Sequence, residues 1–158
     1  MRNAERNVNV TAEQQTAIAL LFLAPAETLY TSTRALHLAR RIAPLNLWIA
    51  IAERVRPFQP SRYQRRWARR LRQAYGFERE DAHHLALASF GEGSEPSIFC
   101  ANFFVTFDLR LIERFQTFHT DIDHRLKRMT CQLLMPYRDA ELPEVLTPQA
   151  VLSRFIPR

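Results

Sequence analysis

The chain has 158 residues, 47% of them hydrophobic, and a formal net charge of +6 at pH 7. This length supports one domain with a substantial core, and the apolar content excludes a wholly disordered chain. Two isolated cysteines, Cys100 and Cys131, exclude a disulfide framework or a standard zinc site. Lys127 is the only lysine, so almost all the positive charge is arginine. Arginine suits phosphate contact, although a GC-rich genome explains the same composition.

The first fifteen residues are polar and charged, and they lack the apolar centre of a signal peptide. The longest apolar runs, 17–26 and 45–52, are shorter than the roughly 20 residues that a membrane helix requires. We therefore expect a cytoplasmic protein with no membrane span.

Residues 1–10 are polar, and we expect them to form a disordered or frayed segment before a single domain over 11–158. Thr11 and Gln14 form the pattern of a capping box, which predicts a helix over 12–24.

The next predicted element is a strand over 27–31. Thr33 then opens a helix with apolar residues at helical spacing. Pro44 breaks this helix, because the residue before a proline resists the helical conformation. A further helix is predicted over 44–55, followed by a short strand over 55–58.

The clearest amphipathic pattern covers 61–75. Its apolar residues recur at helical spacing and should face the core: Tyr63, Trp67, Leu71 and Ala74. The opposite face is basic and carries six arginines: Arg62, Arg65, Arg66, Arg69, Arg70 and Arg72. Such a face is either solvated surface or a phosphate-binding surface, and the mutual repulsion of six like charges favours an external anion.

The stretch over 81–115 predicts a helix, a buried strand and a second helix. Asp81 precedes the first helix, and Gly91 ends it as C-terminal glycines do. Residues 98–106 are apolar and suit a strand buried on both faces of a parallel sheet. Asp108 follows this strand and opens the next helix. Since ligands collect at the carboxyl edge of parallel strands, we expect Asp81 and Asp108 to converge there.

These residues resemble a PIN domain, the fold of many metal-dependent toxin ribonucleases. The resemblance starts with an acid followed by Ala-x-His-Leu-Ala at 81–86, and continues with Val-Thr-x-Asp at 105–108. A last strand and closing segment are similar over 145–152. The match covers about 55–115 well and the remainder weakly. It implies an α/β fold of three layers, with a small parallel sheet of four or five strands flanked by helices.

The resemblance also implies a function. A PIN-like RNA endonuclease would hold Mg²⁺ or Mn²⁺ with Asp81 and Asp108, and Thr106 would position metal or water. RNA phosphates would contact five arginines of the basic face: Arg62, Arg65, Arg66, Arg69 and Arg70. A separate hypothesis, from another class, is a toxin-like protein whose main task is pairing with an antitoxin or with a second copy through the apolar helices 12–24 and 44–55.

Two of the four acids that the family uses are absent. The family's first strand, which ends in Asp, has no counterpart, and no Asp precedes Asp81. Either the domain is degenerate, or Met1 is an internal start and the strand is encoded upstream. Whether the chain is an enzyme is therefore open, and the alternative is a non-catalytic PIN-like module that binds RNA or protein.

Each candidate residue also has a purely structural interpretation. Asp81 and Asp108 both suit helix N-caps. The segment His119-x-Asp121-x-Asp123-His124 matches no standard zinc site, and Asp121 suits the cap of a separate helix that starts near Ile122.

Overall fold

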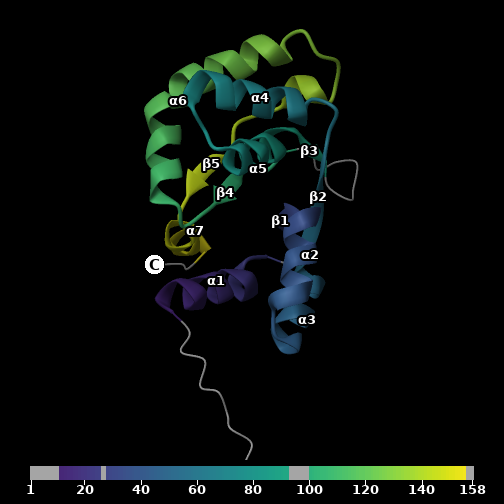
Figure 1. Cartoon of the computed structure of the whole chain (residues 1–158), viewed down its shortest axis with the longest axis vertical. Helices are drawn as coiled ribbons and strands as arrows, with labels where there is room; N and C mark the ends of the chain where they lie inside the picture. Colours follow the sequence, from purple (N-terminus) through teal and green to yellow (C-terminus); the bar gives the residue numbers. More distant parts are fainter. Residues whose placement is uncertain (1–10, 26–27, 93–99, 156–158) are drawn as a thin grey trace, which may run out of the picture.

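A computed structural model describes residues 11–25, 28–92 and 100–155. Within these ranges the protein is of mixed α/β class and mostly helical (Figure 1). The N-terminal half contains three helices and two strands in this order: α1 (Ala12–Leu23), β1 (Leu29–Ser32), α2 (Thr33–Ile42), α3 (Leu45–Arg54) and β2 (Val55–Pro60). The predicted helices and strands of this half are all present, with small shifts in their ends.

The C-terminal half is built around three longer helices. Its elements in chain order are α4 (Gln64–Tyr75), α5 (Arg79–Phe90), β3 (Gly91–Glu92), β4 (Phe103–Val105), α6 (Leu109–Thr130), the 3₁₀ helix η1 (Tyr137–Asp139), β5 (Glu144–Leu146) and α7 (Pro148–Phe155). In Figure 1, α4, α5 and α6 gather at one end of the molecule, while α2 and α3 project from the other.

The described strands form two separate sheets, which corrects the expectation of one parallel sheet. In the first, β1 pairs with β2 in parallel, and β2 pairs with β3 antiparallel. In the second, β4 pairs with β5 in parallel, with Phe104 opposite Val145. The α/β class is therefore correct, whereas the continuous PIN-like sheet is not present in the described residues.

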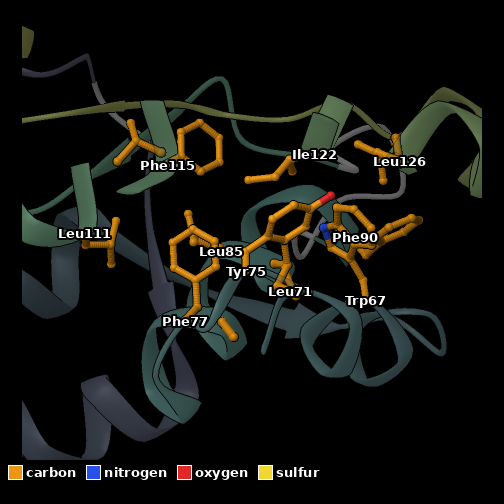
Figure 2. Packing of buried hydrophobic residues seen from close by; sticks show 14 of the residues in the cluster. Trp67, Leu71, Tyr75, Phe77, Leu85, Phe90, Leu111, Phe115, Ile122 and Leu126 are labelled. Carbon is orange, nitrogen blue, oxygen red and sulfur yellow. The ribbon is translucent and has the colours of Figure 1, made fainter. Parts of the chain in front are cut away.

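The larger core lies between α4, α5 and α6. Trp67, Leu71 and Leu85 are almost completely buried in it. Figure 2 shows side chains of α6, including Phe115 and Ile122, pointing toward those of α4 and α5. Trp67 and Leu71 were expected in the core. Ala74 was expected there too but is exposed, because the buried face of α4 runs through Tyr75 instead.

A smaller core joins the two sheets. Leu20 and Ala24, at the end of α1, pack with Val151 and Leu152 of α7. Side chains from all three neighbouring strands lie against this cluster: Leu29 of β1, Val105 of β4 and Leu146 of β5. Helix α5 in turn contacts β2, β3 and β4. The two sheets are thus held beside each other by helices rather than by strand pairing.

Local sequence explains most helix ends. Thr11 and Gln14 form the predicted capping box of α1. Gly76 ends α4 in the left-handed conformation, at φ 67°. Gly91 ends α5 for a different reason from the one expected: its backbone is extended, but a Cβ would lie 2.5 Å from the Leu87 carbonyl oxygen and from the Phe58 ring.

The helix after Asp108 is longer than expected. It runs without a break through Asp121, so no separate helix starts near Ile122, and Asp121 is not a cap. The Asp121 carboxylate instead accepts a hydrogen bond of 2.6 Å from the Tyr75 hydroxyl, which links α6 to α4. No helix in the described parts of the chain combines the length and apolarity needed to cross a membrane.

Candidate functional site

Asp108 caps α6, as the structural interpretation predicted. Its Oδ1 accepts hydrogen bonds from the backbone nitrogens of Arg110 at 2.9 Å and Leu111 at 3.1 Å. The Thr106 hydroxyl oxygen accepts a hydrogen bond from the Asp108 backbone nitrogen at 3.1 Å. One carboxylate oxygen is therefore used by the helix, while Oδ2 makes no hydrogen bond to a described residue. Thr106 and Asp108 lie together in the turn between β4 and α6.

Asp81 is not a cap. Helix α5 begins at Arg79 with Glu78 as its N-cap, so Asp81 lies inside the first turn. Its half-buried carboxylate accepts no hydrogen bond from a described residue. The cap interpretation of Asp81 is therefore wrong, and its structural contribution is that of an acid in the first turn, where the helix dipole favours negative charge.

The negative charge of Asp108 acts on the Asp81 carboxyl. Burial raises the pKa of the Asp81 carboxyl above its ordinary value, and the negative charges of Asp108 and then Glu78 raise it further, while His84 opposes the rise. An acid 27 positions away along the chain is the largest charge effect on Asp81. The charge of Asp108, in the β4–α6 turn, thus acts on Asp81 at the start of α5.

Two histidines, His83 and His84, follow Asp81 on α5. Burial lowers the pKa of His83, and His84, Arg34 and Arg65 lower it further. The His83 backbone oxygen accepts a hydrogen bond from Gln64 Nε2 at 3.0 Å, and the same amide nitrogen lies 2.9 Å from His83 Nδ1. Because an amide nitrogen only donates, Nδ1 accepts and the neutral ring carries its proton on Nε2.

The basic face of α4 is present as expected. Arg65, Arg66 and Arg69 are exposed, and none forms an ion pair with a carboxylate of a described residue. Arg62 lies over two aromatic rings, 4.7 Å from the centroid of Tyr63 and 5.2 Å from that of Tyr137. Arg62 is therefore held by stacking, whereas the other three guanidinium groups face solvent.

This basic face extends onto α6. Burial lowers the pKa of Arg70, and the neighbouring charges of Arg66 and Arg125 lower it further. Arg125 lies over the Tyr75 ring at 5.5 Å, and its Nε is buried without an acceptor among the described residues. Sequence reasoning missed Arg125, because the α6 helix was expected to be broken near this position and its face could not be assigned.

Phe107 is a second residue that the sequence did not single out. It lies between Thr106 and Asp108 and is 42% exposed, although it is a large aromatic residue. An exposed aromatic ring beside a candidate phosphate site suits base stacking. In the sequence, Phe107 is only the unspecified residue x of the Val-Thr-x-Asp pattern.

The donors suit a hard divalent cation but are few. Mg²⁺ and Mn²⁺ prefer carboxylate oxygens, and Asp81 together with Asp108 Oδ2 provides two such ligands. Across the described ranges, no group of three or more His, Cys, Asp or Glu side chains is arranged to hold a metal. This includes the segment from His119 to His124. Any cation at the acid pair would therefore keep most of its water ligands.

The described residues define a mixed α/β protein with a half-buried Asp81, an exposed Asp108 and an arginine-rich face on α4. No protein-family model, curated protein or solved structure matches the chain.

Proposed function

We propose that this chain acts on RNA, with a divalent cation held at Asp81 and Asp108 and the RNA backbone held by α4. The proposal follows the PIN-like resemblance, and one observation carries it. Asp81 is half-buried and without a hydrogen-bond partner among the described residues, and the negative charge of Asp108 raises the pKa of its carboxyl. Bringing like charges together costs free energy, and a bound cation would offset that cost.

Each residue has a role that its position allows. Asp81 and Asp108 Oδ2 supply oxygen ligands, and Mg²⁺ or Mn²⁺ bound there would activate water and neutralise phosphate charge. The Thr106 hydroxyl accepts from the Asp108 backbone and can still donate its own proton toward a nearby oxygen. Phosphates would contact Arg65, Arg66, Arg69 and Arg70, while Arg62 supports the edge of this surface. The reaction would be hydrolysis of a phosphodiester bond.

The test is cleavage of single-stranded RNA in the presence of Mn²⁺ by the wild-type chain and by Asp81→Asn. We expect the substitution to reduce the rate at least about a hundredfold, because the cation would lose one of its two protein ligands. The matched control is Glu53→Gln, which removes an exposed carboxylate from α3 and should leave the rate unchanged. Equal rates for wild type and Asp81→Asn would exclude Asp81 from the chemistry.

Binding without cleavage is a second candidate, and a specific observation favours it. The described residues provide only two carboxylates, and no third acid stands near them in a metal-binding group. In that case RNA would bind to the basic face of α4 with the same affinity in EDTA as in Mn²⁺, and no product would form. Product formation that requires Mn²⁺ and Asp81 would reject this second candidate.

A further inference from the structure

Helices α2 and α3 each have one partly buried face, and their other side is exposed. Neither has a single buried side chain, although α3 has the apolar sequence LNLWIAIAER. Four large apolar residues form what we call the α2–α3 ridge: Leu38, Ile42, Leu45 and Ile49. Ile42 is 72% exposed and Leu45 is 74% exposed. Figure 1 shows that these two helices project from the rest of the molecule.

The ridge is apolar along about one helical turn on each helix. Leu38 and Ile42 are four residues apart on α2, and Leu45 and Ile49 are four apart on α3, so each pair lies on one side of its helix. The Ala43–Pro44 turn joins the two pairs. Exposed apolar surface of this extent on a folded protein marks a contact site.

The end of α1 is attached to the end of α3 and also exposes apolar side chains. The Arg54 side chain of α3 donates hydrogen bonds to the backbone oxygens of Leu21 at 2.7 Å and Ala24 at 2.9 Å. These bonds fix the end of α1 against α3. The two apolar residues between them, Phe22 and Leu23, are both more than half exposed.

Charge identifies the kind of partner. Arg40 and Arg41 occupy the last turn of α2, immediately before Ile42, and both are exposed without an ion pair to a described carboxylate. Glu53 is the only acid on α2 or α3. A symmetric pairing of two copies through these helices would offer Arg40 and Arg41 only Glu53 as a partner acid, and such a surplus of like charge at an interface opposes association.

We propose that the α2–α3 ridge binds an amphipathic helix of another protein, with an apolar stripe flanked by acidic residues. Apolar side chains at spacing i, i+3, i+4 and i+7 on that helix would pack between those of the ridge. Glutamates or aspartates beside the stripe would pair with Arg40 and Arg41. The same arginines that oppose a second copy therefore select an acidic partner.

The test uses two synthetic helical peptides with the same leucine stripe, one flanked by glutamate and the other by lysine. Fluorescence anisotropy measures their binding to the full chain. We expect the glutamate peptide to bind at least about tenfold more tightly than the lysine peptide, and its affinity to fall as salt rises. Equal binding of the two peptides, or no binding of the glutamate peptide, would overturn the proposal.

Two variants locate the binding surface. Ile42→Ser with Leu45→Ser should weaken binding of the glutamate peptide at least about tenfold, because both apolar contacts are lost. The matched control is Leu109→Ser with Leu134→Ser, which changes two similarly exposed leucines outside the ridge and should bind as the wild type does. Equal weakening in both variants would place the contact elsewhere. A wild-type dimer in sedimentation equilibrium that the ridge variant separates would identify a second copy as the occupant and reject the acidic partner.

Discussion

At the scale of single residues, the two acids of the candidate site differ in what they do for the fold. Asp108 accepts two backbone hydrogen bonds and stabilises the first turn of α6. Asp81 accepts none from a described residue, and burial and Asp108 raise its pKa. The sequence allowed both to be caps, because an acid near a helix start suits that role in either case. Only the position of α5, which begins two residues earlier than Asp81, separates them.

This difference predicts opposite effects on stability. Removing the cap with Asp108→Ala should lower the free energy of unfolding by about 0.5–2 kcal/mol.

Asp81 has a raised pKa in the folded state, so its charged form opposes folding above the ordinary pKa of an aspartate. Asp81→Asn should therefore be at least as stable as wild type at pH 7, and the two should converge near about pH 3, where both states are protonated. Thermal unfolding at the two pH values measures this, and a less stable Asp81→Asn at pH 7 would contradict it.

At the scale of elements, local patterns in the sequence located most helices and strands. Local signals, such as the capping box of Thr11 and Gln14, were sufficient to locate these elements. The role of a residue that contacts a distant part of the chain could not be predicted in this way. Asp121 resembles a cap in sequence, but it lies inside α6 because the Tyr75 hydroxyl of α4 satisfies it. Arg125 could be assigned to the basic face only once α6 was known to be continuous.

The basic face of α4 predicts a salt-dependent interaction with RNA. Each phosphate contact on a single strand contributes a slope of about 0.7 to the plot of log K against log salt. Arg65→Ala with Arg69→Ala should weaken binding and reduce this slope by about 1.4 if both contact phosphate. The control is Arg40→Ala with Arg41→Ala, which removes two exposed arginines from α2 and should leave the slope unchanged. Filter binding across a salt series gives both values, and identical slopes for the two variants would contradict contact through α4.

At the scale of the whole molecule, the sequence predicted the class but not the arrangement of the strands. Strand length and apolarity identify a strand, but they do not say which neighbour it pairs with. Here β1 with β2 and β4 with β5 form separate pairs, and the cluster of Leu20, Ala24, Val151 and Leu152 holds them side by side. Asp81 and Asp108 therefore do not share the edge of one parallel sheet, and any cation site between them would depend on helix packing around α5.

The uneven distribution of the core predicts uneven local stability. Helices α4 and α5 contain Trp67, Leu71 and Leu85, all almost completely buried, whereas α2 and α3 bury no side chain. Amides in the interior of α2 and α3 should exchange with deuterium at least about tenfold faster than those in α4 and α5, because local opening exposes little additional apolar surface. Hydrogen exchange followed by mass spectrometry tests this. Equal protection of the two regions in the isolated chain would contradict it.

The hydrogen bonds of Arg54 affect the order in which the chain can acquire its structure. Helix α1 is synthesised first, yet the carbonyl groups of its last turn are satisfied by a side chain about 30 positions later in the chain. Unsatisfied terminal carbonyls leave a helix prone to fraying. During synthesis on the ribosome, the end of α1 therefore stays unsecured until residue 54 has emerged from the exit tunnel and α3 has formed. The end of α1 is then held by α3, while its packing in the smaller core waits for Val151 and Leu152 of α7.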